Sequence, residues 1–170
     1  MRNLLILLAL TFTLSLNAQS DIAQASVQGM FAYASGQIES LAEAIPEDKY
    51  DWSPSEGVRS VKDAILHVAG ANYFFMTKLG FEAPEGVDMM TLGNTEGKDN
   101  VIKILKESNA FAKEKITMVE TGSLGEKVEM PFGDFNRMST LLLVMEHTGE
   151  HKGQLIAYAR ANGIAPPWSE

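Results

Sequence analysis

The chain of 170 residues contains no cysteine. This absence excludes disulfide bonds, a lipid-modified cysteine, a thiol nucleophile and thiolate ligands for a metal ion. Without disulfide bonds, the stability of the folded chain must come from the packing of its core. Any transition-metal site must therefore be built from histidine, carboxylate and water ligands.

Basic residues are also scarce, with 14 Lys and Arg against 22 Asp and Glu, and the formal net charge at pH 7 is -8. Proteins that bind nucleic acid need a basic patch that neutralises phosphates and releases counterions. We therefore expect no nucleic-acid partner. The hydrophobic fraction of 45% is large enough for the chain to bury one compact core.

Charge is missing from the N-terminus after Arg2, where an uncharged run covers residues 4–16. This run is too short to span a bilayer comfortably, and Ala18 lies where signal peptidase would cut, in an imperfect cleavage site. We expect residues 1–18 to be a signal peptide. Residues 19–170 would then form a single domain that is periplasmic or secreted, without stable membrane insertion. An uncleaved membrane anchor is the alternative.

The sequence lacks extended alternation of polar and apolar residues, and it shows instead four segments with helical periodicity. The first segment has a seam of apolar residues spaced three and four positions apart, as in a helical bundle: Val27, Phe31, Ala34, Ile38, Leu41 and Ile45. The second segment begins at Ser60 and Asp63, which have the spacing of a capping box, and ends at Gly80. A connection bearing Gly, Glu and Pro follows, as far as about Gly97.

The third segment carries apolar residues on one side between Val101 and Val119, opposite exposed lysines and glutamates. The last runs from about Arg137 to Ala161, with Gly163 as its C-terminal stop. Between them, "EKVEMPF" could pair as a short strand or cross the bundle as an irregular arm, and the pattern does not decide. Four amphipathic helical segments in one chain predict an all-α fold, a four-helix bundle.

Histidine is also scarce, with three residues in the chain. His147 and His151 lie four residues apart in "LVMEHTGEHKGQL", so both side chains leave the same face of a helix. His67 lies in the second segment near Gly70 and Ala71, whose small size leaves space in front of its ring. Three imidazoles in a bundle core could hold a divalent ion with an open fourth position. The alternative is three unrelated histidines, hydrogen-bonded in a core or solvated at its rim.

The letters "HTGEH" also match H-x-x-E-H, the inverted zincin motif, in which the glutamate is the general base. That motif needs a third ligand well downstream, and few residues follow His151. A match of five residues is weak without its structural context. Glu150 is therefore either a base beside the ion or a solvated helix carboxylate that pairs with Gln154.

The chain resembles the DinB-like superfamily of small four-helix-bundle metalloproteins. The resemblance rests on "IPEDKYDWSPSEGVRS", "SVKDAILHVAGANYFF", "EHTGEHKGQL" and "ARANGIAPP", and it covers about residues 21–168. It implies a bundle with a long crossover connection and a divalent metal ion, zinc or nickel, held by His67, His147 and His151. Gly153 in the same motif would be small so that a neighbouring helix can approach.

Fold and metal do not fix a reaction. The resemblance implies metal-dependent hydrolases or thiol-dependent transferases, and we favour a hydrolase of a small molecule in the periplasm, because low-molecular-weight thiols are not plentiful there. A transferase of a thiol or another group, and a non-enzymatic metal-anchored binding protein, are the alternatives. Glu150, Gln154 and Tyr158 are the candidate catalytic residues, although each could instead pack or support a ligand. The sequence leaves open whether the chain forms a homodimer.

Overall fold

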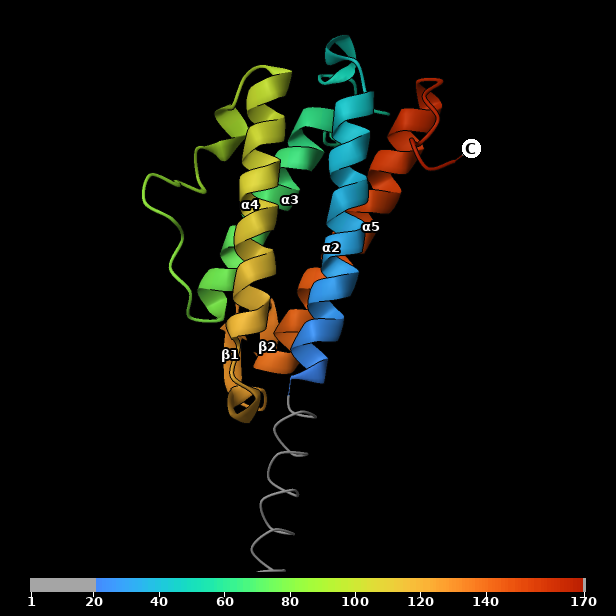
Figure 1. The fold of residues 1–170 in the computed structure, drawn as a ribbon. Coiled ribbons are helices and arrows are strands. Elements are labelled where there is room, and N and C mark those ends of the chain that lie inside the picture. Colours follow the sequence, from blue (N-terminus) through green and yellow to red (C-terminus); the bar gives the residue numbers. More distant parts are fainter. Residues whose placement is uncertain (1–20, 170) are drawn as a thin grey trace, which may run out of the picture.

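The computed structural model describes residues 21–169, so the predicted signal peptide over residues 1–18 lies outside the described residues. Within this range the chain is mainly helical (Figure 1). The long helices are α2 (Ile22–Ala44), α3 (Val61–Lys78), α4 (Lys98–Met118) and α5 (Arg137–Ala161). The remaining elements are the strands β1 (Lys127–Met130) and β2 (Gly133–Asn136) and the 3-10 turns η1 (Glu47–Lys49), η2 (Leu92–Asn94) and η3 (Thr121–Ser123).

The helices form a bundle in which α2 and α5 run in one direction and α3 and α4 in the other (Figure 1). Helix α2 packs against α4 and α5, and α3 packs against the same two helices, so α2 and α3 lie diagonally. Because α3 and α4 are parallel, the segment between them must return along the whole bundle. This arrangement confirms the predicted four-helix bundle and its long crossover connection. No described helix is both long and apolar enough to cross a membrane.

Helices α3 and α5 each begin at a capping residue. Ser60 caps α3 in a capping box with Asp63, and Asn136 caps α5 in the same way with Ser139. Past the other end of α3, Gly80 has a φ of 92°, a left-handed conformation that glycine adopts without strain. The predicted bounds of the last helix, Arg137 and Ala161, are confirmed.

The core runs along the centre of the bundle and contains the seam predicted for the first helix. All six of its residues are buried: Val27, Phe31, Ala34, Ile38, Leu41 and Ile45. On α4, Val101 and Val119 are buried as predicted, whereas Phe111 is only partly covered. Burial of these side chains is the main favourable contribution to folding in a chain without disulfide bonds.

The segment left open as a strand or an irregular arm is a hairpin. Strands β1 and β2 pair antiparallel, and Met130 lies opposite Gly133, which places Pro131 and Phe132 at the tip. The hairpin contacts both α3 and α5. The exposed ring of Phe132 therefore lies near the end of the groove between these two helices.

The explanation expected for Gly153 is wrong. A Cβ atom added at Gly153 would meet no atom within 4 Å, and the residue is exposed. No neighbouring helix among the described residues approaches close enough to require glycine there.

Candidate metal centre

The three histidines lie together between α3 and α5. His67 is in the middle of α3, and His147 and His151 are on consecutive turns of α5, which runs antiparallel to α3. Their rings are 4.4 to 5.0 Å apart, centroid to centroid. One nitrogen of each ring lies within 4.8 Å of the nitrogens of the other two, so the group could hold a metal ion.

The spacing of the nitrogens fits a divalent ion. The Nε2 atoms of His67 and His147 face each other at 3.0 Å. Nitrogens bound at about 2.0–2.1 Å lie roughly 3.3 Å apart around a tetrahedral ion and about 3.0 Å apart in cis positions around an octahedral one. The separation of this pair therefore needs only a small adjustment for either geometry and is compatible with zinc and with nickel.

A chain of hydrogen bonds fixes the orientation of His151. The Tyr158 hydroxyl donates to the Arg59 carbonyl oxygen at 3.1 Å, and the Gln154 amide nitrogen donates to that hydroxyl at 2.7 Å. The Gln154 oxygen therefore faces His151 and accepts from its Nδ1 at 2.7 Å. Because a carbonyl oxygen can only accept, the direction of the whole chain is determined. His151 must carry its proton on Nδ1, and its Nε2 lone pair is left for a ligand.

The protonation states also suit metal binding. Burial lowers the pKa of His67 to about 4, helped by the positive charge of Arg59. Burial likewise lowers the pKa of His147 to about 3, and the neighbouring rings of His151 and His67 add to the shift. Both rings are therefore neutral at pH 7, the form that binds a metal ion.

A cavity of about 470 Å³ opens onto the cluster on the side of the hairpin. Its lining includes His67 and His147 at one end and Phe132 from the hairpin tip. Gly70 and Ala71 leave room on the α3 side, as the sequence predicted. This volume is suitable for a small organic molecule.

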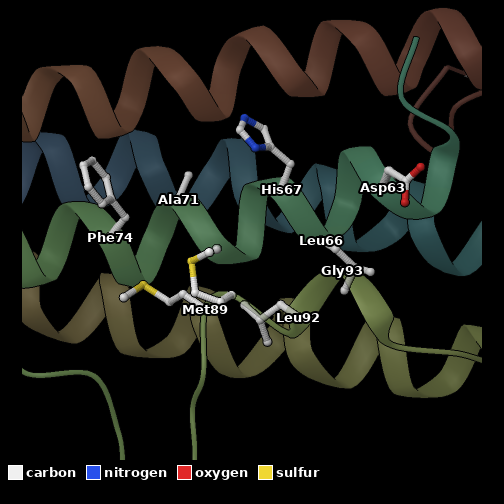
Figure 2. A pocket seen from close by; sticks show the side chains of 10 residues that line it. Asp63, Leu66, His67, Ala71, Phe74, Met89, Leu92 and Gly93 are labelled. Atoms are coloured by element: carbon white, nitrogen blue, oxygen red, sulfur yellow. The ribbon is translucent and has the colours of Figure 1, made fainter. Parts of the chain in front are cut away.

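A second cavity of about 430 Å³ lies between α3 and the crossover segment. It shares His67, Gly70, Ala71 and Phe74 with the first. Figure 2 shows the His67 ring pointing away from Met89 and Leu92 of the crossover segment. The ring nitrogens of the three histidines therefore do not face this second cavity.

The candidate catalytic residues occupy two different places. Glu150 is exposed and lines the cavity beside His147. Gln154 and Tyr158 do not line it and instead form the hydrogen-bond chain behind His151, where Trp52 packs edge-on against Tyr158 at 5.4 Å. The third histidine comes from an upstream helix, whereas the inverted zincin motif needs a downstream ligand.

Sequence reasoning missed three residues near the cluster. Glu146 lines the cavity one turn before Glu150, a spacing that is visible in the sequence but lies outside any motif. Phe132 reaches the cavity only because the hairpin folds, and the hairpin was undecided. Arg59 is connected to the cluster through its carbonyl oxygen and its charge, and no local pattern shows either.

The comparisons with solved structures agree with this fold. A DinB-like protein from Bacillus subtilis has 22% identity and a TM-score of 0.65, covering 81% of this chain and 92% of its own. A DinB-like protein from Bacillus cereus has 14% identity and a TM-score of 0.67, covering 85% and 95%. YfiT from Bacillus subtilis, described as a probable metal-dependent hydrolase with an unusual four-helix bundle topology, has 13% identity and a TM-score of 0.63, covering 84% and 89%.

At these identities the likeness shows the fold alone, and no curated protein matches the chain. The sequence profile of the DinB family matches residues 26–170. This range includes all three histidines, the whole of α3, α4 and α5, and α2 from residue 26 on. The chain therefore belongs to the DinB family.

Proposed function

We propose that this protein is a metal-dependent hydrolase of a small molecule. The observation that carries the proposal is the convergence of His67, His147 and His151 at the end of a cavity of about 470 Å³. A bundle core with facing side chains is a common place for a metal site, and a cavity beside it gives a substrate access. The description of YfiT as a probable metal-dependent hydrolase supports the same class of reaction.

The three imidazoles would hold the ion, and they leave further positions open. When bound, a divalent ion supplies Lewis acidity, which acidifies water and polarises a carbonyl group. His67 and His147 would present Nε2 atoms from two helices, and His151 would present the Nε2 that the Gln154 hydrogen bond leaves unprotonated. Three neutral ligands leave the full positive charge of the ion for chemistry.

Glu150 is the residue placed to accept a proton. Its carboxylate lines the cavity next to His147, and its negative charge acts on His67 by raising the pKa of that ring, against the larger effect of burial. A carboxylate that is not tied in an ion pair can take a proton from a nucleophilic water and return it to a leaving group. Gln154 and Tyr158 are positioning residues, because they act on the ion only through His151.

The test is a metal analysis followed by a hydrolysis screen. Purified protein loaded with zinc or nickel is incubated with a panel of aryl esters, amides and lactones, with and without low-molecular-weight thiols. We expect turnover without a thiol, loss of turnover in His147→Ala and a large decrease of kcat in Glu150→Gln. Glu107→Gln, which removes an exposed carboxylate from α4, is the matched control.

Each other outcome points to one of the alternatives. Turnover that requires a thiol would contradict the hydrolase and indicate a transferase. A tightly bound ion without any turnover would indicate a metal-anchored binding protein. We also propose that the reaction takes place in the periplasm, a proposal that rests on the N-terminal sequence, and fractionation of cells that express the full chain tests it.

A further inference from the structure

We propose that the cavity beside the histidines binds a compound with an apolar, ring-sized body and a positively charged amine or guanidinium group, and that Glu146 selects the positive charge. This inference rests on the proposed function for the reaction, but not for the binding. It defines a substrate class from the wall of the cavity, and Glu146 has no part in the chemistry proposed above.

The apolar part of the cavity lies beyond the histidines, toward the hairpin. Phe74 and Phe75 come from α3, Leu143 from α5 and Phe132 from the hairpin tip. These side chains come from three separate elements and surround one space. An aromatic ring or a branched alkyl group would bury apolar surface on every side, and aromatic walls favour another ring.

The charges that line the cavity are all of one sign. Glu146 and Glu150 are its acidic lining residues, and none of the lining residues is a lysine or an arginine. They lie four residues apart on α5, so their carboxylates share one face of the helix and repel each other. Neither has an ion pair or hydrogen bond to another of the residues 21–169. A cationic ligand would relieve this repulsion.

Arg59 and Lys78 do not line the cavity. Arg59 precedes the first residue of α3, whereas the lining residues of α3 extend from His67 toward its C-terminal end. Lys78 lies over the Phe74 ring at 5.7 Å and is not a lining residue. The wall of the cavity therefore carries no basic side chain that would repel a cationic ligand.

The experiment measures binding of three ligands of similar shape: 2-phenylethylamine, 2-phenylethanol and phenylacetate. Dissociation constants come from NMR titrations of the metal-free protein and of the zinc-loaded protein. We expect the amine to bind about fivefold more tightly than the alcohol, the upper range for an exposed ion pair, and the acid to bind most weakly to the metal-free protein. Glu146→Gln should reduce the preference for the amine to less than about twofold.

Two further variants complete the test. Phe132→Ala, at an exposed hairpin tip, should weaken binding of all three ligands by a similar factor, since it removes apolar wall and no charge. Glu107→Gln should leave every constant unchanged. Equal binding of amine and alcohol, or an amine preference that survives Glu146→Gln, would overturn the proposal. The ligand titrations are also made on the metal-free protein, so they do not depend on the proposed reaction. Failure to bind metal or to turn over a substrate would contradict the proposed hydrolase, whereas the ligand affinities alone decide the proposal for the cavity.

Discussion

The two sides of α3 bury polar groups in opposite ways. Toward α4, Asn72 donates to Ser108 at 3.2 Å and to Asn109 at 2.8 Å, and Asn109 donates to Glu39 at 2.7 Å. Toward α5, His67 meets two other imidazoles whose nitrogens converge beside a cavity.

The polar groups on the α4 side hold the helices together, whereas those on the α5 side are free to bind a ligand. The amide groups on the α4 side bind one another, and a satisfied buried network of this kind fixes how two parallel helices pack. On the α5 side, among residues 21–169, only His151 has a hydrogen-bond partner outside the cluster, and the Nε2 atoms are left to one another or to a ligand. Buried polar groups that lack partners are costly unless something else binds them. We therefore expect a metal ion to bind on the α5 side of α3 and not on the α4 side.

The largest effect is expected from removing the ligands. The double variant His147→Ala, His151→Ala should fall from about one bound divalent ion per chain to almost none, because one imidazole cannot hold the ion. Elemental analysis after dialysis measures this, and circular dichroism checks that the variant folds. A folded variant that keeps its metal would place the ion somewhere other than this cluster.

The next effect concerns the hydrogen-bond chain behind His151. Gln154→Leu should weaken metal binding by about 10- to 100-fold, since His151 loses the acceptor that fixes its tautomer. Competition with a chelator measures the affinity. Gln37→Leu is the control, because Gln37 forms a comparable bond with Tyr33 on the exposed face of α2. If both variants bind metal equally well, the hydrogen bonds from Gln154 and Tyr158 do not position His151.

On the α4 side, removing a buried hydrogen-bonding side chain should lower the stability of the fold without changing metal binding. Asn72→Ala leaves Asn109 and Ser108 with lost partners and should destabilise the fold by about 1–3 kcal/mol. Urea denaturation of the metal-free protein measures the free energy of unfolding, and elemental analysis measures the retained ion. A loss of metal from folded Asn72→Ala would show that the two sides are not separate.

A further effect is a pH dependence of the free energy of unfolding of the metal-free protein. His67 and His147 have native pKa values lowered to about 4 and about 3, whereas an unfolded histidine titrates near 6.5. The unfolded chain therefore takes up protons first as the pH falls, and this contribution to stability, complete above about pH 6.5, is lost progressively toward pH 4 and below.

The variant His67→Gln, His147→Gln should show a shallower decrease over that range. Urea denaturation at pH 7, 5.5 and 4.5 in the presence of a chelator makes the comparison. Both proteins carry the same carboxylates, so the difference between the two curves reports on the two histidines. Parallel curves would mean that these rings are not neutral in the native state.

Much of this could be predicted from the sequence, for local reasons. Capping residues such as Ser60 depend on a few neighbours, and so do the seam of α2 and the shared face of His147 and His151. The position of His67 opposite them followed from the family resemblance. The local pattern alone allowed three unrelated histidines.

The rest depends on contacts between distant segments. The bond from Tyr158 to the Arg59 carbonyl joins residues far apart in the chain, and so does the contact of Asn72 with Asn109. The hairpin was undecided because four-residue strands carry little pattern, and with it the place of Phe132 was unknown. Gly153 shows the converse error, since a packing reason was assigned to a residue that faces open space.

The central claim is that three imidazoles from two helices hold one divalent ion, and X-ray absorption spectroscopy of the zinc-loaded protein tests it most directly. The account predicts three imidazole nitrogens at about 2.0–2.1 Å together with oxygen ligands in the open positions. A first shell of oxygen atoms alone, or protein that takes up no zinc in proportion to its chains, would contradict it.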